Sequence, residues 1–158
     1  MKYKEIVKKV SIPAQSKTKQ KEYLSSGTLP IIDQGKFLIG GYSNDVDNEL
    51  ECELPVIVFG DHTKCVKYIN FPFVPGADGI KVLKPKEGIY PKYLFYYTQY
   101  LTYRIEDKGY ARHYQYIEKE DVLHIAKLAC LKLKEEEIDH DFSNYKETDD
   151  QAIIYLFR

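Results

Sequence analysis

Several features that mark other protein classes are scarce in this sequence. None of its 158 residues is tryptophan, and its three cysteines, Cys52, Cys65 and Cys130, have no CxxC spacing. No apolar run approaches the roughly 20 residues that a membrane helix needs. The charged start over residues 1–5 is not followed by the apolar core of a secretory signal. We therefore expect a cytoplasmic protein with reduced thiols and no membrane partner.

The net charge of −1 conceals an uneven distribution of charged residues. Residues 1–21 carry seven lysines against the single acid Glu5, and residues 135–150 carry eight acidic residues. A basic front and an acidic tail that nearly cancel still allow one positive face. The 15 tyrosines either reflect codon usage or supply a surface that contacts bases, sugars or another protein.

Short apolar runs separated by glycine, proline and acidic turns predict a sheet of short strands. The runs cover residues 29–32, 37–39, 54–59, 65–69 and 80–84. After Pro91 the apolar period changes to three and four residues, which predicts one clear helix with Leu94, Tyr97, Leu101 and Ile105 on one face. Residues 116–134 mix both patterns. The expected fold is a small α+β domain with a mixed or antiparallel sheet and few helices.

Loops between these elements carry most of the polar side chains. We expect four of them to gather at one end of the sheet, where binding residues usually lie: residues 11–28, 42–53, 60–64 and 107–115.

The turn between the runs at 54–59 and 65–69 joins an acid, an imidazole, a hydroxyl and an amine. His62 and Cys65 form one HxxC pair, which is too few ligands for a zinc site. The GxSxG frame of a hydrolase and the GxxxxGK frame of a phosphate loop are absent. We therefore predict no metal, no cofactor and no catalytic residues, and we interpret Asp61, His62 and Thr63 as a structural loop.

Two segments have side chains that are better suited to binding nucleic acid than to catalysis. Residues 109–114 combine a guanidinium, an imidazole and phenols, and residues 17–21 supply phosphate-seeking lysines. The alternative is that these are solvated loops, with Arg112 pairing with Glu106 or Asp107.

The order of the motifs resembles the target recognition domain of Type I restriction-modification specificity subunits. The resemblance rests on "PVIVFGDHTKCVKYINFPFVPGADGIKVLKP", then "YPKYLFYY", then "GYARHYQYI", with "LPIIDQGKFLIGGYSND" upstream. It covers residues 29–118 well and residues 1–28 loosely. It implies a domain over residues 1–134, followed at 135–158 by an acidic tail with a short apolar end where the family has a spacer helix.

This resemblance implies a non-catalytic module that reads one half of a bipartite site in double-stranded DNA. The implied partners are a methyltransferase subunit and, as a further partner, a restriction subunit. The predicted DNA contacts are made by phosphate-binding lysines and base-reading side chains, namely Lys17, Lys19, Lys21, Ser43, Asn44, Lys64, Arg112, His113 and Tyr114. The alternative function is a truncated specificity-like subunit that self-associates or binds a methyltransferase, with little DNA binding of its own.

Overall fold

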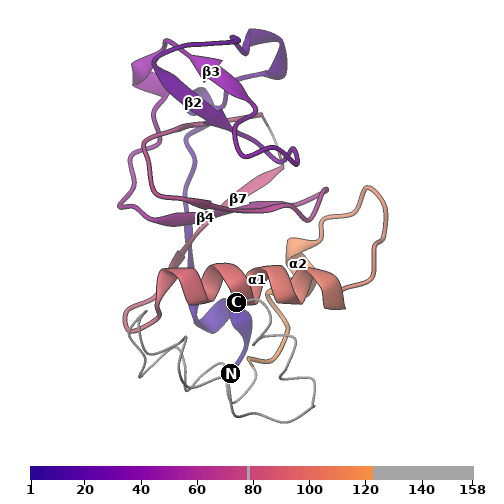
Figure 1. Cartoon of the computed structure of the whole chain (residues 1–158). Helices are drawn as coiled ribbons and strands as arrows, with labels where there is room; N and C mark the ends of the chain where they lie inside the picture. The colour runs from indigo at the N-terminus through magenta and orange to yellow at the C-terminus, as the bar shows by residue number, and fades with distance from the viewer. Residues whose placement is uncertain (78, 123–158) are drawn as a thin grey trace, which may run out of the picture.

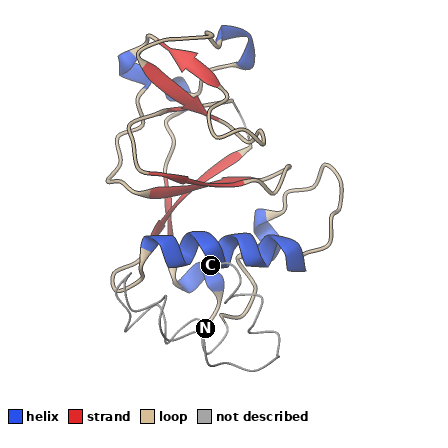
Figure 2. Cartoon of the chain, in the orientation of Figure 1, coloured by secondary structure: helices blue, strands red, loops and turns tan. Residues whose placement is uncertain are grey.

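Three layers make up the protein (Figure 1). The computed structural model describes residues 1–77 and 79–122. A four-stranded sheet lies in the middle, a small three-stranded sheet lies on one face of it, and the helix α1 covers the other face. Figure 2 shows the two groups of strands in red and α1 in blue. The expected small α+β fold is confirmed.

The central sheet has the order β1-β7-β4-β5, and every neighbouring pair is antiparallel. Its strands are β1 (Val7–Val10), β7 (Ile80–Pro85), β4 (Val56–Gly60) and β5 (Val66–Ile69). All of β4 is buried because layers cover both faces of this strand, which explains its unbroken apolar run. The predicted hairpin of residues 54–59 with 65–69 is confirmed in β4 and β5.

The helix α1 spans Pro91–Arg104 and starts at the proline that its sequence predicted. Leu94, Tyr97 and Leu101 are buried on its inner face, which packs against Phe59 and Leu83 of the sheet. The one-turn helix α2 (Tyr114–Ile117) and the 3₁₀ helix η1 (Tyr3–Glu5) complete this layer. The apolar residues spaced three and four apart in the sequence therefore form the face by which the helix contacts the sheet.

The small sheet has the order β3-β2-β6. Its strands are β2 (Leu29–Ile32), β3 (Gly41–Ser43) and β6 (Val74–Pro75), with β2 antiparallel to β3 and parallel to β6. Three short 3₁₀ helices connect these elements, namely η2 (Ala14–Ser16), η3 (Gln20–Glu22) and η4 (Val46–Asn48). A second apolar core, which includes Ile32, Val58 and Phe73, fills the space between the two sheets.

One predicted strand is wrong. Residues 37–39 form a loop in which the Phe37 side chain is 72% exposed, and the strand follows at β3 instead. The Gly40 N–H donates to the Ile31 carbonyl at 2.9 Å and closes this loop, so antiparallel pairing resumes only at Gly41. Phe37 and Leu38 project outward, whereas Ile39 is half-buried and packs against the core between the sheets.

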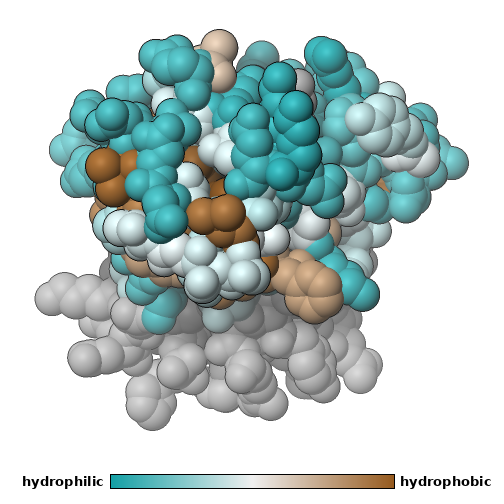
Figure 3. Space-filling model, turned by 90° about the horizontal axis from the view of Figure 1, so that it is seen from above, coloured by the Kyte–Doolittle hydropathy of each residue, from teal (hydrophilic) through white to brown (hydrophobic). Residues whose placement is uncertain are grey.

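The four polar loops do not gather at one end, which corrects that expectation. Residues 11–28 and 42–53 lie together around the small sheet, where η2 contacts η4 and Leu24 pairs with Tyr42. Residues 60–64 and 107–114 meet instead beside the end of β4, at the right of Figure 1. Seen from the small-sheet end, the surface is mostly hydrophilic with a few hydrophobic side chains among the polar ones (Figure 3). The predictions for residues 123–134 and for the tail at 135–158 lie outside the described residues.

Candidate nucleic-acid interface

The turn that joins β4 to β5 is tightly closed. The Gly60 N–H donates to the Cys65 carbonyl at 2.8 Å, and the Lys64 N–H donates to the Gly60 carbonyl at 2.9 Å. Lys64 adopts φ 60°, a left-handed conformation that costs a residue with a side chain about 1 kcal/mol. A Cβ at residue 60 would collide with the Thr63 hydroxyl, so this position requires glycine. Backbone hydrogen bonds and the crowding at Gly60 thus fix the conformation of this turn.

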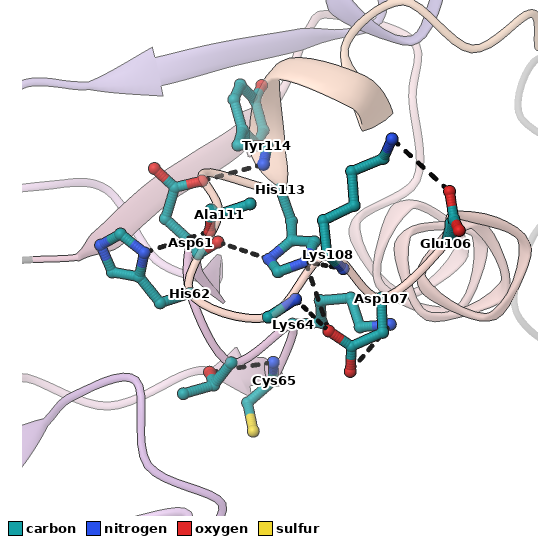
Figure 4. A network of polar contacts seen from close by, with 12 residues as sticks. Asp61, His62, Lys64, Cys65, Glu106, Asp107, Lys108, Ala111, His113 and Tyr114 are labelled. Atoms are coloured by element: carbon teal, nitrogen blue, oxygen red, sulfur yellow. Dashed lines mark hydrogen bonds and ion pairs between the residues drawn. The ribbon is translucent and has the colours of Figure 1, made fainter.

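Asp61 joins this turn to the segment that follows α1 (Figure 4). Its side chain is buried, at 4% exposure, and Oδ1 accepts the Tyr114 N–H at 2.8 Å. The Asp61 carbonyl accepts the His113 N–H, also at 2.8 Å. Lys81 Nζ lies 3.9 Å from Asp61 Oδ2 and supplies a positive charge to the buried carboxylate. Asp61 therefore acts as a structural acid, but its partner lies 53 residues away rather than within the turn.

His113 is fully buried beside Asp61. Its Nδ1 lies 3.0 Å from the Asp61 carbonyl, and its Nε2 lies 3.4 Å from the Lys108 N–H. A carbonyl only accepts and an N–H only donates, so the two contacts fit a ring protonated on Nδ1. The imidazole thereby connects the turn at residue 61 to the chain at residue 108. We call the hydrogen-bonded set of Asp61, His113 and Tyr114 the clasp.

His62 and Thr63 hold two further segments against the turn. The Thr63 hydroxyl donates to the Gln34 carbonyl at 2.6 Å, and the His62 N–H donates to Gln34 Oε1 at 3.2 Å. The His62 ring donates from Nδ1 to the Ala111 carbonyl at 3.1 Å and stacks on Tyr110 with ring centroids 4.0 Å apart. The turn therefore positions the loop after β2 and the segment after α1 at the same time.

The loop after β2 is fixed at its base by Asp33 and Lys67. The Lys67 ammonium is buried, donates to the Asp33 carbonyl at 2.7 Å and lies 3.5 Å from the Asp33 carboxylate. Burial lowers the pKa of Lys67, while the Asp33 charge acts in the opposite direction. Burial, aided by Asp33, raises the pKa of the neighbouring Tyr23 to about 12.

These contacts bring three loop segments together at the end of β4. We call the surface formed by residues 35–39, 62–64 and 108–112 the loop rim. It carries positive charges on Lys36, Lys64, Lys108 and Arg112, and its Tyr110 side chain is 85% exposed. The adjacent acids pair with two of these lysines, Glu106 with Lys108 at 3.5 Å and Asp107 with Lys64 at 3.9 Å.

The predicted DNA-contacting residues divide into separate groups. Lys64 and Arg112 lie on the loop rim, and Lys17, Lys19 and Lys21 are exposed in the loop around the small sheet.

His113 and Tyr114 are 0% and 2% exposed, and their burial in the clasp corrects their assignment as surface donors. Asp61, far away in sequence, accepts both of their backbone N–H groups and contacts His113 Nδ1, and sequence spacing does not reveal that partner.

Ser43 and Asn44 stabilise local turns. The buried Ser43 hydroxyl accepts the Asp45 N–H at 3.1 Å, and Asn44 Oδ1 accepts both the N–H and the hydroxyl of Thr28. Both side chains hold the chain around β3, away from the loop rim.

Sequence reasoning did not assign four side chains of the loop rim to the site: Lys36, Phe37, Leu38 and Lys108. The available signal was the turn sequence Asp33-Gln34-Gly35, which marks a loop immediately after a buried strand.

A pocket of about 240 Å³ opens beside β1 and β7 and is lined in part by Lys9, Lys17 and Lys81. Lys9 Nζ lies 4.5 Å from the centroid of the Tyr114 ring and 3.1 Å from the Glu118 carboxylate. Burial and the charges of Glu118 and Asp61 raise the pKa of Tyr114, which keeps this phenol neutral. Lysines from three segments thus line this pocket, with the Lys9 ammonium paired to Glu118 and the Lys81 ammonium 3.9 Å from the Asp61 carboxylate.

Within the described ranges, no three His, Cys, Asp or Glu side chains are grouped so that they could hold a metal ion. Across the same part of the chain, the helices are too short and too polar to cross a membrane.

Comparison with known proteins adds one similarity. No family model matches the chain. The chain is similar to the specificity subunit of the Type I restriction enzyme EcoR124I/EcoR124II from Escherichia coli, at 26% identity over 109 residues. The match covers 67% of this chain and 27% of that subunit, so the chain spans about a quarter of the relative. The similarity supports a relationship to restriction specificity subunits as a group.

Proposed function

We propose that the chain is a non-catalytic module that recognises one half-site in double-stranded DNA for a Type I-like restriction-modification system. The observation that carries the proposal is the clasp. It joins two of the segments by which the sequence resembles a target recognition domain, the one around Asp61 and the one around His113. The similarity to a restriction specificity subunit supports the same function.

The loop rim has the chemistry of a DNA-binding surface. Its lysines suit phosphate oxygens, which supply most of the affinity of such interfaces. Arg112 carries a planar guanidinium that can donate two parallel hydrogen bonds to a guanine edge. The pocket at Lys9, Lys17 and Lys81 offers a further phosphate site, and Lys19 and Lys21 extend positive charge along the small sheet.

The buried contacts below the loop rim explain why its side chains can act together. The turn at residues 60–65 is closed by backbone hydrogen bonds, and Asp61, His62 and Thr63 hold the neighbouring segments to it. Side chains on a fixed surface lose less freedom on binding, so more of the contact energy appears as affinity. The acid, imidazole and hydroxyl of this turn therefore serve assembly of the interface rather than catalysis.

Fluorescence anisotropy with a random pool of labelled duplexes, repeated over a range of salt concentrations, tests the proposal. We expect the double variant Lys64→Ala/Arg112→Ala to bind more weakly and to lower the log–log salt slope by about 1, because the Lys64 phosphate contact is lost together with the Arg112 base contact. Lys86→Ala removes one exposed charge beyond the opposite end of β7 and serves as the control. Equal binding by the double variant and the control would show that the loop rim is not the interface.

The proposed protein partner is a methyltransferase subunit, with a restriction subunit joining the same assembly. Size-exclusion chromatography of the chain alone and with a methyltransferase subunit tests this part. Co-elution is the expected result. A chain that elutes as a dimer, binds no duplex and ignores the methyltransferase would instead favour a self-associating module.

A further inference from the structure

The tip of the loop after β2 exposes two large apolar side chains. Phe37 is 72% exposed and Leu38 is 50% exposed, and both belong to the loop rim. The run Phe37-Leu38-Ile39 reads as a core strand in the sequence, yet in the fold Phe37 and Leu38 point to solvent. Solvent exposure of adjacent large apolar side chains on a tight loop needs a binding role or another covering surface to explain it.

The base of this loop is held rigidly while its tip projects. At the start of the loop the Gly35 N–H donates to Asp33 Oδ1 at 2.9 Å, and at its end the Gly40 N–H donates to the Ile31 carbonyl at 2.9 Å. Gln34 is held by Thr63 and His62, as described above. A Cβ atom on Gly60 or on Gly79 would collide with the Gln34 side chain, so both glycines leave room for it. The chain therefore fixes the direction in which the tip projects.

The surroundings of the tip are cationic. Lys36 Nζ lies 5.5 Å from the centroid of the Phe37 ring, and the turn at residues 62–64 that holds Gln34 also carries Lys64. Two apolar side chains are too few for the core of a stable protein interface, which needs about 800 Å² from each partner. They do match the apolar wedge with flanking cations that minor-groove binding proteins insert between base pairs.

We propose that Phe37, supported by Leu38, inserts between two neighbouring base pairs of the bound duplex while Lys36 and Lys64 hold the phosphates on either side. This inference rests on the proposed DNA binding, and it states how the loop rim would distort the bound duplex. Insertion from the minor groove unstacks one base step and bends the duplex away from the protein. Sequence specificity would then depend on how easily that base step opens, in addition to any base contact by Arg112.

The test uses a duplex recovered from a random pool by the wild-type chain, with 2-aminopurine placed at successive positions. The wild-type chain should raise 2-aminopurine fluorescence at one base step only. Phe37→Ala should abolish that rise and weaken binding about tenfold, because base–aromatic stacking is lost. Phe37→Leu should keep part of both effects, since leucine also serves as a wedge. Val46→Ala, which truncates an exposed apolar side chain on η4, should change neither.

The outcomes separate this inference from the function on which it rests. If the wild-type chain binds no duplex even at low salt, DNA recognition fails and the wedge fails with it. If Phe37→Ala binds as tightly as wild type, or if no base position responds, the wedge alone is overturned. Loss of methyltransferase binding by Phe37→Ala, with DNA affinity unchanged, would assign the tip to protein docking and also overturn the wedge. Circular dichroism confirms that the variant is folded.

Discussion

Replacement of Asp61 by alanine tests the clasp directly. The change removes the carboxylate that accepts the Tyr114 N–H at 2.8 Å and leaves that N–H buried without its acceptor. The backbone contacts between the Asp61 carbonyl and His113 remain, because they do not involve the side chain. The variant therefore isolates the contribution of one buried carboxylate to the attachment of the segment after α1.

The expected cost follows from the burial of this contact. A hydrogen bond to a charged group contributes about 1.5–3 kcal/mol, and an orphaned buried donor adds to the loss. We expect Asp61→Ala to lower the free energy of unfolding by about 3 kcal/mol. With a urea m-value of about 2 kcal/mol per molar for a chain of this size, the midpoint falls by about 1.5 M. Asp61→Asn keeps an acceptor oxygen and should cost only about 1 kcal/mol.

Urea unfolding followed by tyrosine fluorescence and by circular dichroism measures both variants. Asp47→Ala removes an exposed carboxylate on η4 and should stay within about 0.5 kcal/mol of wild type. If Asp61→Ala unfolds at the wild-type midpoint, or if Asp61→Asn is as costly as Asp61→Ala, the reasoning about the clasp is refuted.

Three further predictions follow from the turn and the loop base. Lys64→Gly removes the cost of the left-handed backbone at φ 60° and should stabilise the chain by about 1 kcal/mol in urea melts. The same variant should bind duplex DNA more weakly. A loss of stability would contradict the claim that Lys64 is strained. Gly60→Ala should destabilise by about 1–3 kcal/mol, since its Cβ collides with the Thr63 hydroxyl, and an unchanged melting curve would contradict this crowding. The pKa of Tyr23 is raised to about 12, so its contribution to stability is complete below about pH 10 and is lost as the pH rises toward 12. Tyr23→Phe should therefore show a shallower loss of stability over this window than wild type, and parallel curves would count against the assignment.

The elements of the fold were predictable where apolar pattern and local turn chemistry agree. The continuous run in β4 is buried between the two outer layers, and the three-and-four spacing in α1 forms the face that packs on the central sheet. The strand predicted at residues 37–39 was wrong because Phe37 and Leu38 lie exposed in a loop, and no local rule separates an exposed apolar loop from a short strand. Gly40 and Gly41, read as the end of a strand, instead close the loop and begin β3.

The candidate site was predictable only in part because its key contacts are distant in sequence. The two segments were identified separately, and Asp61, His62 and Thr63 each hydrogen-bond to a distant segment of the chain. Their role as a structural loop stays a prediction. Nothing near His113 in the sequence indicates that an acid 52 residues earlier buries it. The exposure of Arg112 followed from its place in a polar turn, whereas Lys64 is only partly exposed. The third segment of the loop rim, residues 35–39, includes the run that was predicted as a strand.

Hydrogen exchange of the intact chain, measured with and without a duplex recovered from a random pool, tests most directly whether the loop rim binds DNA. Backbone amides in residues 35–39, 62–64 and 108–112 should exchange more slowly when the duplex is present, while amides on the outer side of α1 stay unchanged. Protection confined to α1, with the loop rim exchanging as in the free chain, would contradict the account.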